Sequence, residues 1–192
     1  MFMAKQTEKT GINQRIDSMS VEEMKLRLAE YMSTDPHLAP RPVSIEVRVS
    51  DINNTKCRYD VLLIDSEGKE KEIMFHDRYS RLIYIYTLMH PEGYQRRVST
   101  ANDYKAFRVL YTLLYQKDSE ALIKTIDSTN FEHFFSHYVA QSRNAVRKAT
   151  THASDFAIDR PQSHEGKVLI PFVAQGGNVV IDTTLRNQMA NL

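Results

Sequence analysis

Residues 131–151 read FEHFFSHYVAQSRNAVRKATT, and this stretch decides the fold expected for the chain. Apolar side chains recur along it at three- and four-residue spacing, as on the buried face of an amphipathic helix. Thr129 and Glu132 have the spacing of a capping box, which would begin this helix. The positions predicted to face the core are Phe131, Phe134, Phe135, Tyr138, Val139, Ser142 and Val146. The sequence therefore predicts a long helix with one side packed on a core.

The opposite side of the same helix is polar and basic, and no acidic residue lies between Ser136 and Thr151. Forked amide and guanidinium groups read base edges in DNA, and Lys and Arg also bind phosphate. The residues of this side are Ser136, His137, Gln141, Arg143, Asn144, Arg147, Lys148 and Thr151. This composition favours contact with DNA, and the alternative is a face that only meets solvent.

The composition is that of an ordinary globular chain, because 42% of its 192 residues are hydrophobic and 26% are charged. The formal net charge is only +1, so a basic surface for DNA has to be local. The single cysteine, Cys57, excludes an internal disulfide and a cysteine zinc cluster. It is typical of a reducing compartment, so a cytoplasmic location is expected. No apolar run approaches the roughly 20 residues that span a bilayer, so no membrane contact is expected.

Two regions are expected along the chain. Ser20 and Glu23 have the spacing of a second capping box, which predicts a helix that ends near residue 32. Three prolines between residues 36 and 42 would stop that helix. Residues 1–42 are therefore predicted to form a flexible leader with a helical arm, and residues 43–192 the main domain. The apolar stripe of the arm helix suits a homodimer or another protein partner.

The main domain begins with strand patterns and continues with helices. Residues 43–49 alternate between apolar and polar side chains, and two further strand-like runs are joined by a turn at Gly68. Residues 82–89 are apolar on nearly all sides, which predicts a buried central helix that Asp77 caps. The remaining expected elements are strands at 59–64, 69–75, 156–158, 167–172 and 178–182, and helices at 103–116 and 119–126.

Three of these stretches carry a resemblance to a known family. They are the hairpin at 59–75, the run LIYIYTLMHPEG at 82–93 and the helix VAQSRNAVRK at 139–148. In this order they resemble the winged-helix DNA-binding effector domain of two-component response regulators, over roughly residues 43–172. The resemblance implies an α+β fold with an N-terminal antiparallel sheet, three helices and a C-terminal hairpin wing. Its wing strands would be residues 156–158 and 167–170.

The resemblance also implies a DNA site on the long helix and on the wing. The helix would face the major groove or its phosphate rim, and the wing would approach the adjacent backbone. The residues so assigned are Gln141, Arg143, Asn144, Arg147 and Lys148 on the helix, and Arg160, His164 and Lys167 at the wing. The expected function is that of a DNA-binding or transcription-associated regulatory protein. The alternative is a structural or protein-interaction protein of the same shape that does not bind DNA.

Other motifs indicate little chemistry. His133 and His137 lie one helical turn apart, as in a metal-binding pair, but no third ligand stands at helical spacing, so two surface histidines are predicted. Gly176 and Gly177 lack the rest of a phosphate-binding loop and predict a turn. No serine, cysteine or carboxylate pair stands in a catalytic arrangement. The chain is therefore not predicted to be an enzyme, and no metal or cofactor is expected.

Overall fold

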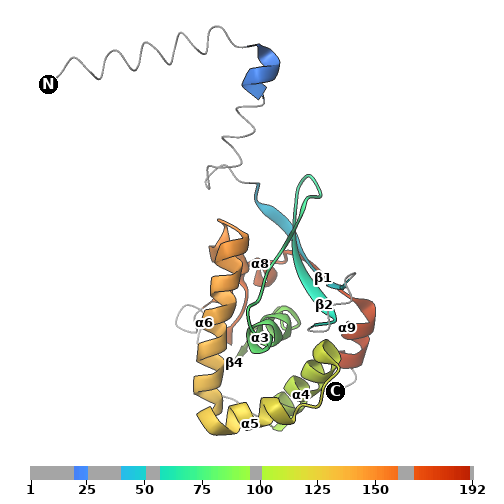
Figure 1. Ribbon diagram of the computed structural model, residues 1–192, viewed down its shortest axis with the longest axis vertical. Helices are drawn as coiled ribbons and strands as arrows, with labels where there is room; N and C mark the ends of the chain where they lie inside the picture. Colours follow the sequence, from blue (N-terminus) through green and yellow to red (C-terminus); the bar gives the residue numbers. More distant parts are fainter. Residues whose placement is uncertain (1–19, 26–39, 51–56, 96–100, 160–166, 191–192) are drawn as a thin grey trace, which may run out of the picture. The chain divides into compact units, whose positions relative to one another are not determined.

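The computed structural model describes residues 20–25, 40–50, 57–95, 101–159 and 167–190 (Figure 1). The chain divides into two compact units, Met1–Ala39 and Pro40–Leu192. In the first unit residues 21–25 are helical. The predicted capping box is present, because Ser20 N–H donates to Glu23 Oε2 at 3.0 Å and Glu23 N–H donates to Ser20 Oγ at 3.2 Å. The rest of the predicted arm helix lies outside the described residues.

The second unit contains a four-stranded sheet in the order β3-β2-β1-β6. Strands β1 (Pro42–Val49), β2 (Tyr59–Asp65) and β3 (Glu70–Glu72) pair antiparallel, as the alternation predicts. Gly68 closes the β2–β3 turn with a φ of +80°, which favours glycine. Strand β6 (Asn178–Ile181) lies on the other side of β1 and runs parallel to it. The antiparallel sheet predicted for the N-terminal part of the domain is confirmed, and the parallel strand β6, whose place in this sheet was not predicted, makes the whole sheet mixed.

Helix α3 (Arg78–Leu88) is the central helix of the core. Asp77 is its N-cap and accepts a hydrogen bond from Ser80 N–H at 2.7 Å. Every residue from Tyr79 to Leu88 is buried, which confirms the prediction from the apolar run. Figure 1 shows α3 between the strands and the helices that follow it. The core therefore forms on all sides of one helix.

Three more long helices follow: α4 (Ala101–Tyr115), α5 (Glu120–Thr129) and α6 (Phe131–Ala149). Asn130 alone separates α5 from α6, and its side chain accepts a hydrogen bond from His133 N–H at 2.9 Å. The predicted capping box at Thr129 is wrong, because Thr129 still belongs to α5 and donates its hydroxyl to Thr125 O at 2.8 Å. With α3, four helices stand where the resemblance implied three.

The first strand of the predicted C-terminal hairpin wing is also corrected. Residues 156–158 form no strand: Phe156 ends the short helix α7 (Ala153–Phe156). Because Phe156, Ala157 and Ile158 are all buried, these residues lack the alternation of an exposed wing strand. One backbone hydrogen bond, from Asp159 N–H to Leu169 O at 2.8 Å, joins the two predicted wing segments. Residues 160–166, which would form the tip, lie outside the described residues.

The second predicted wing strand and the segment after it take different partners from those expected. Strand β5 (Lys167–Val168) pairs antiparallel with β4 (Tyr94–Gln95), which follows α3. Pro171 begins the short helix α8 (Pro171–Ala174), as proline often does at the first position of a helix. Helix α9 (Thr183–Ala190) follows β6 and ends the described part of the chain. The fold is therefore α+β, with a mixed sheet and a second, two-stranded ladder.

None of the helices in the described ranges is both long enough and apolar enough to cross a lipid bilayer.

Candidate nucleic-acid interface

Helix α6 has one buried and one exposed side. The prediction of its inward side is confirmed at Phe134, Phe135, Ser142 and Val146, which are buried. The other predicted core positions pack against the core only from its edge. The fully buried residues are Phe134, Phe135, Ser142, Ala145, Val146 and Ala149. Phe131, Tyr138 and Val139 are half-buried at the two edges of this side. The helix is thus held along its whole length.

Aromatic contacts fix the position of α6 on its neighbours. The Tyr79 ring of α3 lies 5.4 Å from the Phe134 ring and 5.0 Å from the Tyr138 ring, both edge-on. Phe135 packs edge-on against Tyr94 of β4 at 5.9 Å. Burial raises the pKa of Tyr138, and the nearby Asp77 carboxylate adds to this effect, so the phenol stays neutral at physiological pH. These contacts hold the outer side of α6 in a fixed orientation.

We call the outer side of the helix the α6 polar face. Its residues share one side because they recur at three- and four-residue spacing, and all of them are exposed. They are His133, Ser136, His137, Ala140, Gln141, Asn144, Arg147 and Lys148. Four of the predicted site residues, namely Gln141, Asn144, Arg147 and Lys148, are therefore brought together on a single exposed surface.

The other predicted site residues lie elsewhere. Arg143 is only half exposed, because it stands at the edge of the helix beside Val139 and Val146. Lys167 is half-buried in β5. Arg160 and His164 lie outside the described residues. The structure therefore brings four of the predicted residues together on α6, and it shows that Arg143 and Lys167 are less exposed than these four.

The charges around the α6 polar face come from several elements. Lys148 Nζ donates to His76 Nε2 at 3.1 Å, which brings a residue from the β3–α3 connection to the face. Beyond the end of α6, Asp155 is paired with Arg41 at 2.7 Å. Glu132 is exposed in the first turn of the helix. Helix α6 is thus basic at its C-terminal end and acidic at its N-terminal end.

This distribution of charge has a structural explanation as well as a functional one. Glu132 lies at the positive end of the helix dipole, and Arg147 and Lys148 lie in the last turn, at the negative end. Charges in these positions stabilise a helix by about 0.3–1 kcal/mol each. The amide side chains of Gln141 and Asn144 have no such role in the helix. They are therefore the residues of the face that point most directly to a ligand with hydrogen-bonding edges.

Sequence reasoning missed some contributors to this surface. His76 and Lys148 are 72 positions apart, and no local pattern links them. The N-cap Asn130 was missed because the Thr129–Glu132 spacing fits a different cap equally well. Within the described residues, no group of three His, Cys, Asp or Glu side chains could hold a metal ion. His133 and His137 are exposed members of the α6 polar face.

Comparison of the chain with protein-family models, with curated proteins and with solved structures finds no match.

Proposed function

We propose that the protein is a DNA-binding regulatory protein in which helix α6 enters the major groove. The observation that supports this proposal is the exposure of four polar and basic side chains on one face of a helix whose other face packs on the core. These residues are Gln141, Asn144, Arg147 and Lys148. A major groove about 12 Å wide admits an α-helix. With 19 residues, α6 is long enough to follow the groove and reach the phosphates beside it.

The two kinds of side chain on this face have different roles in the proposal. Gln141 and Asn144 lie one turn apart and read base edges, since an amide can both donate to and accept from adenine. Arg147 and Lys148 lie near the end of the helix and bind phosphate, which fixes the register of α6 on the duplex. Arg143, at the edge of the helix, contributes to the phosphate contacts and not to base reading.

The proposal includes a winged-helix-like arrangement of the region after α6. It is supported by the β4–β5 ladder and by the hydrogen bond from Asp159 N–H to Leu169 O, which bring residues 159 and 167–169 back beside the chain that follows α3. In this arrangement Arg160, His164 and Lys167 approach the DNA backbone next to the groove. The exposed Val21 and Met24 support a partner-binding role for the N-terminal helix, with a second copy of the chain or another protein.

A second candidate is an interaction protein of the same fold that does not bind DNA. It is favoured by the charge of the chain, because a net charge of +1 supplies little attraction for a polyanion. It is also favoured by the position of Arg147 and Lys148 in the last turn, where they stabilise the helix without any ligand. In this case Gln141 and Asn144 would meet another protein through the same hydrogen-bonding groups.

Fluorescence anisotropy with labelled duplex DNA, in random-sequence and genomic pools, separates the two candidates. At low salt we expect measurable binding by the unaltered chain and much weaker binding by Arg147→Gln/Lys148→Gln. The matched control is Lys69→Gln/Lys117→Gln, which removes the same charge from two exposed lysines outside α6. Equal weakening by both pairs would show that net charge and not α6 attracts DNA. If the unaltered chain does not bind DNA at low salt, the DNA-binding proposal is wrong and the interaction protein is the remaining candidate.

Sequence selection from the random pool tests the base-reading role. Gln141→Ala or Asn144→Ala should weaken binding to the selected sequence by about 1–3 kcal/mol and leave binding to unselected DNA nearly unchanged. Arg147→Ala should weaken both to a similar extent, because a phosphate contact carries no sequence information. A uniform loss from the amide variants would contradict the assignment of roles.

A further inference from the structure

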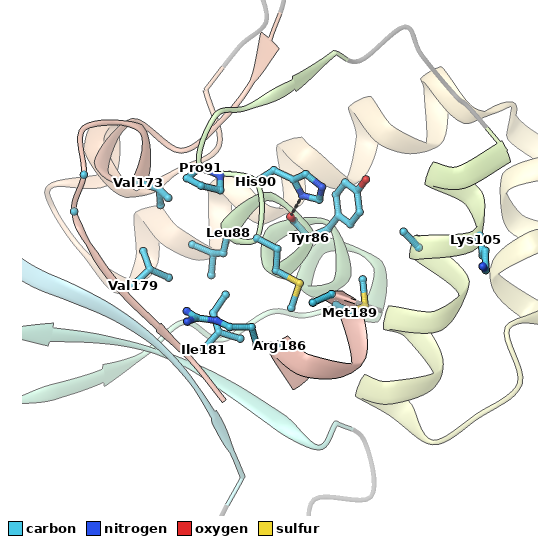
Figure 2. A pocket seen from close by; sticks show the side chains of 15 residues that line it. Tyr86, Leu88, His90, Pro91, Lys105, Val173, Val179, Ile181, Arg186 and Met189 are labelled. Carbon is cyan, nitrogen blue, oxygen red and sulfur yellow. Dashed lines mark hydrogen bonds between the residues drawn. The ribbon is translucent and has the colours of Figure 1, made fainter. Parts of the chain in front are cut away.

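A pocket of about 770 Å³ lies on the second unit, away from α6 (Figure 2). Its walls come from the C-terminal end of α3, from α4, from the α8–β6 connection and from α9. The volume falls in the range of roughly 300–1,000 Å³ that is typical of small-molecule sites. None of the residues that line it belongs to α6, so this pocket is distinct from the α6 polar face.

Two glycines build one wall of the pocket. Gly176 has a φ of +81°, and a Cβ atom at Gly177 would lie 2.5 Å from Phe172. Gly177 N–H donates to Phe172 O at 2.9 Å and so closes the turn after α8. Larger residues would push this turn away from α8. The two glycines therefore form the tight turn between α8 and β6 that lines this side of the pocket.

The floor of the pocket is apolar. Its aliphatic and thioether side chains come from four different elements and meet around one space in Figure 2. They are Leu88, Met89, Val173, Val179, Ile181 and Met189. Methionine side chains adapt to ligands of irregular shape, because they are unbranched and polarisable. The floor therefore suits an extended apolar group.

The charged groups of the pocket are all basic. Arg186 and Lys105 line it at opposite ends in Figure 2, and no carboxylate is among the described lining residues. Within the described part of the chain neither of these two side chains forms an ion pair. His90 also lines the pocket and donates from Nδ1 to Tyr86 O at 2.8 Å, which leaves Nε2 as an acceptor in the neutral ring.

We propose that this pocket binds a small amphipathic molecule with an apolar body and one carboxylate. The carboxylate pairs with Arg186, because a guanidinium presents a planar fork that matches the two oxygens of a carboxylate. The apolar body lies along Leu88, Val179 and Met189. Arg186 is a better partner for the carboxylate than Lys105, because it lies next to Ile181 of β6 in Figure 2. A carboxylate bound there is close to the apolar side chains of the floor.

Isothermal titration of the full chain with decanoate, below the concentration at which decanoate forms micelles, tests this proposal. 1-Decanol is the neutral probe of equal chain length, and acetate is the headgroup alone. We expect decanoate to bind at one site per chain, about tenfold or more tightly than 1-decanol, as one charge-assisted hydrogen-bonded pair provides. Acetate should show no measurable binding, because it lacks the apolar body.

Three variants assign the binding to this pocket. Arg186 is exposed, so its replacement is not expected to disturb the fold. Arg186→Gln should lower the affinity for decanoate about tenfold and leave the affinity for 1-decanol unchanged. Ala190→Phe, also exposed, should fill the pocket and weaken both ligands. Lys117→Gln, an exposed charge outside the pocket, is the control and should bind decanoate as the unaltered chain does.

The proposal is overturned by no binding of decanoate, by equal affinity for decanoate and 1-decanol, or by unaltered decanoate binding in Arg186→Gln. If Ala190→Phe does not fold, the comparison of Arg186→Gln with Lys117→Gln still shows whether decanoate binds through Arg186. Because no DNA is present in the titration, its outcome is independent of whether α6 binds DNA.

Discussion

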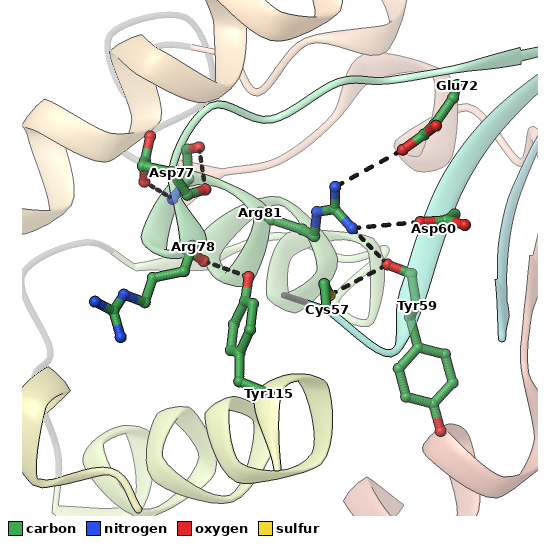
Figure 3. A network of polar contacts seen from close by, with 9 residues as sticks. Cys57, Tyr59, Asp60, Glu72, Asp77, Arg78, Arg81 and Tyr115 are labelled. Carbon is green, nitrogen blue, oxygen red and sulfur yellow. Dashed lines mark hydrogen bonds and ion pairs between the residues drawn. The ribbon is translucent and has the colours of Figure 1, made fainter. Parts of the chain in front are cut away.

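Arg81 in α3 donates a hydrogen bond from Nη1 to the carbonyl oxygen of Tyr59 in β2 at 2.7 Å (Figure 3). The same guanidinium lies 3.5 Å from Asp60 and 3.8 Å from Glu72, and its side chain is only 9% exposed. The buried guanidinium of Arg81 therefore links helix α3 to strands β2 and β3 of the sheet. Helix α3 also packs against α6, because the Tyr79 ring contacts the rings of Phe134 and Tyr138. The Arg81 contact therefore helps to hold the candidate interface in position.

Arg81→Met should lower the free energy of unfolding by about 3 kcal/mol, because it leaves the buried carbonyl oxygen of Tyr59 and two half-buried carboxylates without their partner. Arg48→Met is the matched control: Arg48 also lies between two carboxylates, Glu46 and Glu70, but is 44% exposed. Its loss should cost less than about 1 kcal/mol. Urea unfolding measures both values. Similar costs for the two variants would contradict a special role for the buried contact.

Glu72 gives a prediction about pH. Burial raises the pKa of this carboxyl, the Asp60 carboxylate raises it further, and Arg81 opposes both effects. The folded state therefore holds this proton at a pH where the unfolded chain has lost it. Below the unfolded pKa the carboxyl is neutral in both states, and its destabilising effect develops as pH rises through the folded pKa.

The comparison of the unaltered chain with Glu72→Gln isolates this effect. The difference in free energy of unfolding, unaltered chain minus variant, should fall as pH rises from about 4.3, the ordinary pKa of a glutamate, through the raised pKa of Glu72 in the folded state. Chemical unfolding at several pH values measures it. A difference that rises over this window would mean that the pairing with Arg81 outweighs burial.

Asn130 should show two separable effects. Its side chain caps α6, and its backbone has φ +60° and ψ 156°, a region in which nearly all residues other than glycine are strained. Asn130→Ala should destabilise the protein by about 1–2 kcal/mol, because it loses the cap and keeps the strain. Asn130→Gly should cost only a few tenths of a kcal/mol, because glycine relieves the strain. Thermal unfolding measures both variants, and a higher melting temperature for Asn130→Ala than for Asn130→Gly would contradict this explanation.

The two sides of α6 should differ in their effect on stability. Phe135 is buried against Tyr94, so Phe135→Ala should cost about 3–5 kcal/mol through the cavity that it leaves. Arg147→Ala should lower the free energy of unfolding by no more than about 1 kcal/mol, since Arg147 is exposed and the variant loses only its interaction with the helix dipole. Denaturant unfolding of the two variants measures both changes. The reverse order would overturn the assignment of the two sides of the helix.

Much of the fold follows from local patterns in the sequence. The apolar run at 82–89 predicts α3, the three- and four-residue spacing predicts α6 and its inward side, and Gly68 predicts the β2–β3 turn. These predictions succeed because each depends on residues close together in the chain. The same periodicity places Gln141 and Asn144 on the exposed side, so the centre of the candidate site was also predictable.

The errors come from contacts that no local pattern encodes. Strand β6 pairs with β1 at Val179 and Ile45, which are 134 positions apart, and a short apolar strand does not specify its partner. Phe156 was assigned to a wing strand, but burial of three consecutive residues excludes alternation there. Arg143 was grouped with the exposed residues, although its position beside Val139 and Val146 makes it half-buried.

The dependence of DNA affinity on salt tests the central claim most directly. Binding through phosphates releases counterions, so each lost phosphate contact should lower the slope of log affinity against log salt by about 0.9 for B-form DNA. Arg147→Gln/Lys148→Gln should therefore give a shallower slope than the unaltered chain by about 1.8 if both residues bind phosphate. The Lys69→Gln/Lys117→Gln control should keep the original slope. An unchanged slope in the α6 variant, or no DNA binding at low salt, would contradict the proposal that this helix binds DNA.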